Sequence, residues 1–204
     1  MTTIVEPGEV PEIASWYFDG RGIFYVKGQN GIVRRDVQTK DEREILAPAT
    51  SDFQFFRFAV SPDGRQVAVM GRLKNTEGLI VRLVPVDGGA ARDLLVDNHQ
   101  TGLGWVTWTP DGKFLLFNRY GADDQLAGLW YISAAGGQAH KLQLSGVQDR
   151  AIMNVAIHPD GKQLAFNTDE NTRKSEIWVL ENFLPPLADS KPAAAANASA
   201  AKSR

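Results

Sequence analysis

The chain has 204 residues, of which 43% are hydrophobic and 9% aromatic, so it is long enough to bury a core of ordinary size. Its formal net charge is −2 and its lysines and arginines are scattered, which excludes the clustered basic surface of a protein that binds nucleic acid or anionic membranes. There is no cysteine, which excludes disulfides, thiolate catalysis and cysteine metal sites.

The beginning of the chain contains one short β-prone run, residues 2–5, followed by Pro7, Gly8 and Pro11. No basic segment leads into an apolar stretch, and no apolar run approaches the roughly 18 residues of a membrane span. From the sequence as given, we expect a soluble chain that does not insert into membranes and has no export signal. The compartment stays open: cytoplasmic as written, or periplasmic if the chain is part of a longer exported protein.

A short turn sequence recurs along the chain. Residues 61–65 (Ser-Pro-Asp-Gly-Arg) have near-copies at 109–113 and 158–162, and a degenerate copy at 18–21. Proline presets the backbone, aspartate bonds the backbone two residues on, and glycine takes the left-handed conformation, so each copy predicts a tight turn between antiparallel strands. The residues assigned to these structural turns are Asp19, Gly20, Asp63, Gly64, Asp111, Gly112, Asp160 and Gly161.

The β-prone runs around these turns form four groups. The first three groups each predict four strands: 13–18, 23–26, 32–37 and 42–46; then 55–60, 67–70, 79–86 and 91–96; then 103–109, 114–118, 129–133 and 140–144. The fourth group predicts only three strands: 152–158, 164–167 and 175–180. It ends at Pro185-Pro186, so the fourth group is one strand short.

The spacing of the turns predicts a repeat architecture. The turn aspartates are 44, 48 and 49 residues apart, near the length of a four-stranded propeller blade. We expect blades over residues 12–50, 51–99, 100–148 and 149–187, and a disordered Ala-rich tail over 188–204. If the four blades close on themselves, the run 2–5 is expected to pair beside 176–180 and fasten the first blade to the last, because an open edge strand is normally covered.

A resemblance supports this architecture. Residues 61–69 read Ser-Pro-Asp-Gly-Arg-Gln-Val-Ala-Val, residues 129–132 read Leu-Trp-Tyr-Ile, and Gly136-Gly137 precedes a closing Lys141-Leu142. The pattern resembles the TolB-type, WD-repeat-like β-propeller repeat of bacterial proteins over residues 12–184. It implies an all-β fold, a β-propeller of four-stranded antiparallel blades. Residues 176–183 resemble the terminal blade of longer bacterial proteins in which such a propeller follows a signalling or regulatory domain.

The number of blades leaves three arrangements open. The resemblance implies propellers that mostly have six or more blades, whereas this chain contains four. The four blades are therefore a closed small ring, part of a larger propeller, or one member of an assembly that self-associates to complete a propeller.

Two polar residues are expected near the channel of the propeller. The first strand of each blade lines the axis, and alignment on the turns places Arg57 and Asn154 nearest the channel mouth. Both are candidates for binding a ligand or partner. The alternative for Arg57 is extension into solvent or pairing with Asp52.

Longer connections lie on the face opposite the Pro-Asp-Gly turns, and they are rich in Asp, Asn, Arg and Gln. Such loops suit a binding surface, so Arg119, Asp123 and Asp124 are further candidates for partner binding. The alternative for Asp123 and Asp124 is a solvated charge pair. The turn aspartates are far apart in sequence and do not predict a calcium site, and the three histidines lack metal-ligand spacing.

Catalytic motifs are absent from the sequence: it has no Gly-x-Ser-x-Gly elbow, no phosphate-binding loop and no His-Glu-x-x-His. We predict a non-catalytic propeller scaffold, without cofactor or metal, that binds a protein or peptide as the sensory or interaction module of a larger bacterial signalling or envelope system. One alternative is the substrate-gating propeller of a peptidase or hydrolase whose catalytic domain is on another chain. Another is a metal-dependent propeller hydrolase.

Overall fold

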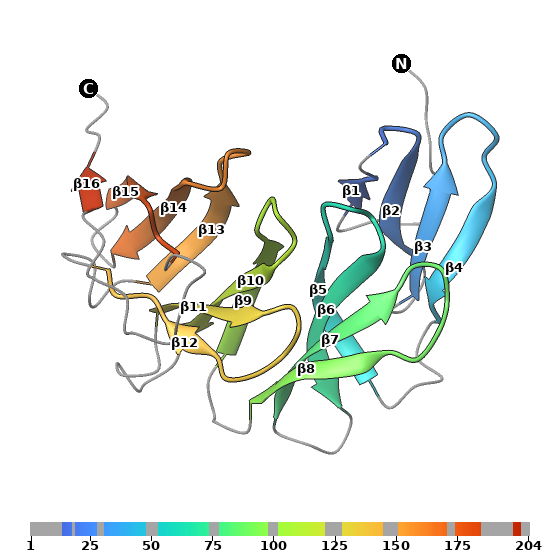
Figure 1. Ribbon diagram of the computed structural model, residues 1–204, viewed down its shortest axis with the longest axis horizontal. Helices are drawn as coiled ribbons and strands as arrows, with labels where there is room; N and C mark the ends of the chain where they lie inside the picture. The colour runs from blue at the N-terminus through green and yellow to red at the C-terminus, as the bar shows by residue number, and fades with distance from the viewer. Residues whose placement is uncertain are drawn as a thin grey trace. The chain divides into compact units, whose positions relative to one another are not determined.

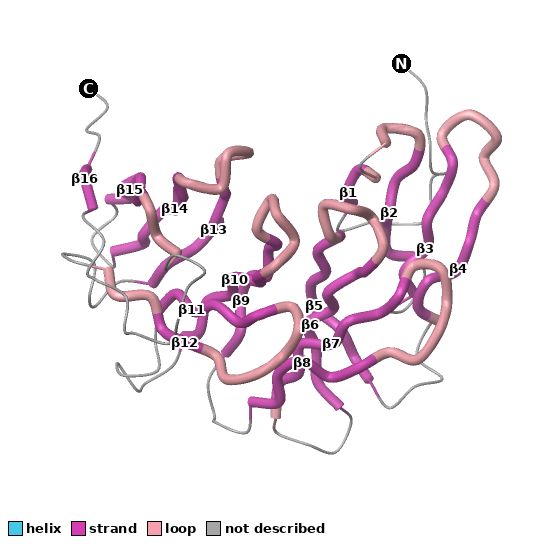
Figure 2. The backbone as a smooth tube through the Cα atoms, viewed as in Figure 1, coloured by secondary structure: helices cyan, strands magenta, loops and turns pink. Residues whose placement is uncertain are grey.

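The computed structural model describes residues 14–17, 19–27, 31–47, 53–73, 78–97, 102–120, 128–144, 151–170, 174–184 and 198–200. Over these residues all regular structure is β-strand, and none is helix (Figure 2). The chain divides into two compact units, Met1–His99 and Gln100–Arg204. Each unit contains two four-stranded antiparallel sheets whose strands lie in chain order.

The first unit contains the first and second sheets (Figure 1). The strands of the first sheet are β1 (Ala14–Trp16), β2 (Gly22–Lys27), β3 (Gly31–Asp36) and β4 (Glu42–Leu46). The strands of the second sheet are β5 (Phe53–Val60), β6 (Gln66–Leu73), β7 (Leu79–Pro85) and β8 (Arg92–Asp97).

The second unit contains the third and fourth sheets. The strands of the third sheet are β9 (Gly102–Trp108), β10 (Phe114–Tyr120), β11 (Gly128–Ser133) and β12 (His140–Lys141). The strands of the fourth sheet are β13 (Ala151–Ile157), β14 (Gln163–Glu170), β15 (Lys174–Glu181) and β16 (Ala198–Ala200). The strands of the first three sheets lie within residues 12–50, 51–99 and 100–148, whereas the fourth sheet takes its last strand from residues 198–200.

The fourth sheet has a strand that the sequence did not predict. β16 pairs antiparallel with β15, with Ala200 opposite Trp178 and Ala198 opposite Leu180. It comes from the tail expected to be disordered, and it occupies part of the edge expected to pair with residues 2–5. The predicted closing strand 2–5 and the rest of the tail lie outside the described residues.

Each sheet has two faces, which we name by their packing. In the first unit, Phe24 and Ile32 of the first sheet belong to one core with Phe58 of the second sheet. In the second unit, Leu116 of the third sheet likewise shares a core with Phe166 of the fourth sheet. The leading face of a sheet is the one that carries Phe24 in the first sheet and Leu116 in the third, and the trailing face is its opposite. In both units a leading face packs on the trailing face of the next sheet.

The predicted turns form with side-chain support. The hydroxyl of Ser61 donates to Asp63 Oδ1 over 2.6 Å and accepts the Gln66 N–H over 2.9 Å, while Asp63 also accepts the Arg65 N–H. Thr109 and Asp111 repeat this arrangement in the third sheet. The glycines of all four turns have φ between 68° and 72°, the left-handed region where a Cβ atom is strained.

The pKa values of Asp63, Asp111 and Asp160 are lowered by their turn contacts. Donation from the Ser61 hydroxyl, followed by the Arg65 N–H, lowers the pKa of Asp63. Burial opposes ionisation of Asp111, yet the Thr109 hydroxyl and the Lys113 N–H keep its pKa below the usual value. In the fourth sheet His158 replaces the hydroxyl residue. There the pKa of Asp160 is lowered by the Lys162 N–H first and by His158 second.

We expect the free energy of unfolding to fall as the pH is lowered from about 5 to about 2. A lowered pKa in the folded state gives stability that is present above the unfolded-state value of about 3.9 and is lost as the pH falls through the folded-state value. Ser61→Ala should make this decline shallower and cost about 1–2 kcal/mol at neutral pH, because the Gln66 N–H loses its acceptor. Urea unfolding at a series of pH values measures both effects.

The matched control is Ser133→Ala, because the Ser133 hydroxyl accepts a backbone N–H in a turn without a carboxylate partner. An unchanged pH dependence in Ser61→Ala would contradict the assignment of the Asp63 pKa to its hydroxyl partner.

Candidate functional site

The first strands of three sheets share a bulge. The register of β5 with β6 shifts between Phe55 and Arg57, and β9 and β13 show the corresponding shift against their partners. In all three sheets the shift lies between four and eight residues before the turn aspartate. Bulges re-aim side chains and are frequent beside functional sites, so we take the residues at each bulge as candidate functional residues of their own unit.

The bulges display two of the predicted binding residues. Arg57 follows the bulge of β5, where it is half-buried and donates to the Phe56 carbonyl over 2.9 Å. Asn154 lies within the bulge of β13, is exposed, and has a φ of 51° that few residues other than glycine and asparagine adopt readily. Phe56 is 36% exposed, which is unusual for a large aromatic side chain on a first strand. The sequence analysis did not select Phe56.

Close backbone approach stabilises the bulge of β5. Gly71 pairs with Phe55, and a Cβ atom at Gly71 would lie 2.3 Å from the Gln54 carbonyl oxygen and 2.7 Å from the Phe55 Cα. Only glycine fits at this point without a shift of the backbone. Gly71, on the neighbouring strand β6, is therefore the residue that positions Phe56 and Arg57.

A buried amide stabilises the bulge of β9. Asn118 Oδ1 accepts the Trp105 N–H over 2.6 Å, and Asn118 Nδ2 donates to the Ile152 carbonyl over 2.9 Å. Asn118 thus satisfies a backbone donor at the bulge and also joins the third sheet to the first strand of the fourth. Asn118 was not predicted as a functional residue, because it lies inside a predicted strand and has no motif around it.

Among the other predicted site residues, Arg119 is described, and it does not lie with these groups. Arg119 is buried on the trailing face of the third sheet, and its guanidinium carbon lies 4.2 Å from the centre of the Trp130 ring. It therefore faces away from the fourth sheet, and the structure does not bring it beside Asn154. Asp123 and Asp124 lie outside the described residues.

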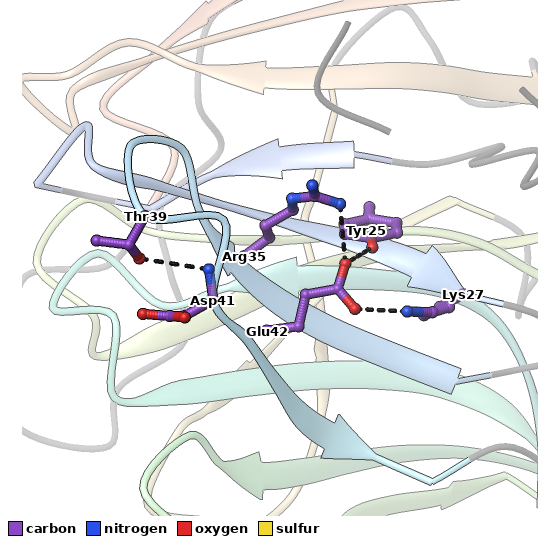
Figure 3. A network of polar contacts seen from close by, with 6 residues as sticks. All are labelled: Tyr25, Lys27, Arg35, Thr39, Asp41 and Glu42. Atoms are coloured by element: carbon purple, nitrogen blue, oxygen red, sulfur yellow. Dashed lines mark hydrogen bonds and ion pairs between the residues drawn. The ribbon is translucent and has the colours of Figure 1, made fainter. Parts of the chain in front are cut away.

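A second polar cluster lies on the trailing face of the first sheet. Glu42 accepts hydrogen bonds from Tyr25, Lys27 and Arg35, the last over 3.0 Å (Figure 3). Donation from Lys27, followed by Tyr25, lowers the pKa of Glu42, whereas burial and then the Glu42 contact raise the pKa of Tyr25. A carboxylate held ionised by three donors is unsuited to act as a general acid at neutral pH, so we read this cluster as an internally paired network.

The described residues contain no group of three or more His, Cys, Asp or Glu side chains that could hold a metal ion. The same part of the chain has no helix long and apolar enough to cross a membrane.

Comparison with known proteins shows which folds this chain resembles. No protein-family model and no curated protein matches the chain. The solved structures that it matches include oligogalacturonate lyase from Vibrio parahaemolyticus, at a TM-score of 0.69 and 16% identity over 86% of this chain and 52% of the lyase. TolB from Acinetobacter baumannii matches at 0.67 and 15% identity, over 87% of this chain and 42% of TolB.

The fold is a β-propeller of four-stranded antiparallel blades. A prolyl endopeptidase also matches, at a TM-score of 0.62 and 17% identity, over 84% of this chain and 28% of the peptidase. The chain thus spans about half the length of the lyase and less of the other two proteins. These matches confirm the TolB-like propeller fold predicted from the repeat. Sequence identities this low show the fold alone and do not show function.

We predict that Asn118→Ala destabilises the chain by about 3 kcal/mol, because the Trp105 N–H and the Ile152 carbonyl both lose a buried partner. Asn167→Ala is the control: Asn167 occupies the equivalent position in the fourth sheet and makes no side-chain hydrogen bond to a described residue. Chemical denaturation measures both variants. Equal losses would show that the Asn118 hydrogen bonds contribute little.

We also predict that Gly71→Ala costs on the order of 3 kcal/mol, because the added methyl group meets backbone atoms. Gly20→Ala, at a φ of 69° with nothing within 4 Å of its added Cβ, should cost only about 1–2 kcal/mol of backbone strain. The difference in thermal stability between the two variants isolates the crowding at the bulge. A Gly71→Ala variant as stable as Gly20→Ala would contradict the close approach.

Proposed function

We propose that the chain is a non-catalytic propeller module that binds a protein or peptide at the bulged first strands and the loops that precede them. The observation that supports this proposal is the set of bulges in the first strands. They recur at similar positions before the turns of three sheets. The bulge of β5 exposes Phe56 next to the half-buried Arg57, and the bulge of β13, in the second unit, exposes Asn154.

The chemistry of these groups suits peptide recognition. Phenylalanine offers apolar contact area, and arginine and asparagine offer donors for backbone carbonyls and carboxylates. First strands line the axis in propellers, and the register shifts lie near the middle of β5, β9 and β13. The loop predicted to bind through Asp123 and Asp124 lies outside the described residues.

This proposal assigns the module to a larger bacterial signalling or envelope system, as the repeat resemblance implies. It is supported by the match to TolB over most of this chain, which is a likeness of fold. In this proposal Arg119 stacks on Trp130 and supports the sheet, and it does not contact the partner.

The gating propeller of a hydrolase remains a second proposal, supported by the match of the same sheets to a prolyl endopeptidase. It requires a catalytic domain on another chain. Co-purification of a serine hydrolase whose turnover of long peptides, and not of short ones, changes with this chain would favour gating over scaffolding.

We expect peptides selected from a random library on the immobilised chain to lose affinity on the order of tenfold for Phe56→Ala, Arg57→Ala or Asn154→Ala. Lys113→Ala and Lys162→Ala are the controls, because both lysines are exposed beside Pro-Asp-Gly turns. Calorimetry on folded variants measures the change. Selected peptides whose binding depends on the two lysines and not on the bulge residues would contradict the proposal.

A further inference from the structure

Two arginines lie on one face of the second sheet, beside its bulge. In the pairing of β5 with β6 (Figure 1), Arg57 is opposite Met70 and Gln54 is opposite Arg72. Val69 packs in the core with the first sheet, so Met70, the next residue on β6, lies on the leading face. Arg57 shares this face as the partner of Met70, and Arg72 shares it two residues further along β6. Diagonal neighbours of this kind are roughly 7–8 Å apart, so one ligand can contact both side chains.

The two arginines differ in how they are held. Arg57 is half-buried, and its Nη1 donates to the Phe56 carbonyl over 2.9 Å, which fixes the guanidinium beside the bulge. Arg72 is exposed, and its side chain makes no hydrogen bond or ion pair with a described residue. A guanidinium presents five N–H donors in a planar fork that matches a carboxylate. Arg72 is therefore available to an incoming anion.

The carboxylate on this face does not neutralise the two arginines. Asp97 is the one carboxylate among the paired strand residues described on the leading face of the second sheet. It pairs with Leu79, which pairs with Arg72, so Asp97 lies two strands from Arg72, about 10 Å away. Asp97 is also only 1% exposed. The described part of this face therefore has an excess of positive charge beside the bulge.

This charge distinguishes the bulge of the second sheet from that of the fourth. Asp169 pairs with Ala151 as Arg72 pairs with Gln54, and both Asp169 and Arg72 lie nine residues after their turn aspartate. The fourth sheet thus has the opposite charge at this position. A preference for carboxylates is therefore assigned to the second sheet.

Phe56 adds an apolar group to the same place. It is the extra residue of the bulge, it directly precedes Arg57, and it is 36% exposed. A ligand that complements this bulge therefore combines negative charge with an adjacent apolar group. A peptide segment with an acidic residue next to an aliphatic or aromatic one has this chemistry.

Building on the proposed function, we propose that the bulge of the second sheet binds an acidic peptide segment. Carboxylates of the segment pair with Arg57 and Arg72, and a neighbouring apolar side chain packs on Phe56. Bidentate hydrogen bonds from a guanidinium to a carboxylate are stronger than neutral ones and fix the orientation of the ligand. A nucleic acid fits less well, because its binding needs many phosphate contacts and the other basic residues of the chain are scattered.

The test uses peptides selected from a random library on the immobilised chain, restricted to those that lose affinity in Phe56→Ala. We expect these peptides to contain Asp or Glu, and replacement of that residue by Asn or Gln should lower their affinity on the order of tenfold. Arg72→Gln should cause a similar loss for the original peptide and little further loss for the replaced one, because the two groups interact directly. Calorimetry measures all four combinations.

The matched control is Arg65→Gln, because Arg65 is exposed beside the Pro-Asp-Gly turn of the same sheet and its replacement changes the net charge equally. Arg72 is exposed as well, so the melting temperature of Arg72→Gln should match that of the unmodified chain. An equal loss of affinity in Arg65→Gln would overturn the inference, because it would show a general effect of charge.

Other outcomes separate this inference from the proposed function. Peptides that depend on Phe56 but bind equally well without their carboxylates, or losses that simply add, would overturn the acidic preference and leave peptide binding at the bulges standing. If no selected peptide depended on the bulge residues, the proposed function would fail and this inference with it. A short single-stranded oligonucleotide that displaced the acidic peptides at equal concentration would assign the arginines to nucleic acid instead.

Discussion

Each described sheet carries apolar side chains on both faces, and the rest of the structure follows from the need to cover them. A four-stranded sheet of this kind is stable only between two others, so the chain repeats the same unit and packs leading face on trailing face. This constraint explains why residues in the middle of the third strands, such as Val81 and Leu129, are fully buried. It also means that any repeat array has a first and a last face that need a partner.

The bulges show how the repeat accommodates a local exception to strand geometry. An extra residue in the first strand turns neighbouring side chains outward but leaves backbone groups to be satisfied. The second sheet solves this by close contact with Gly71, and the third by the amide of Asn118. Different residues thus support one backbone feature, which indicates that the backbone geometry, and not one side chain, is the shared element.

The sequence predicted the four sheets because the Pro-Asp-Gly turns and the alternating apolar runs are local signals. Strand boundaries agree within a few residues, apart from the shorter β12, and each turn aspartate bonds a backbone N–H as expected. β16 could not be predicted, since Ala-Ser-Ala carries no strand signal and gains its pairing only from the exposed edge of β15. Arg119 could not be placed either, because stacking on Trp130 depends on tertiary register.

The bulges, in contrast, have a signal in the sequence. Apolar residues of the first strands are spaced by three and then by two: 55, 58 and 60; 103, 106 and 108; 152, 155 and 157. Strict alternation would give spacings of two throughout, so the extra residue marks one position added to each strand. That break falls beside Arg57 and within the segment of Asn154, the two residues selected for the channel mouth. The bulge and the exposure of these polar residues therefore both follow from the same break in the alternation of apolar residues.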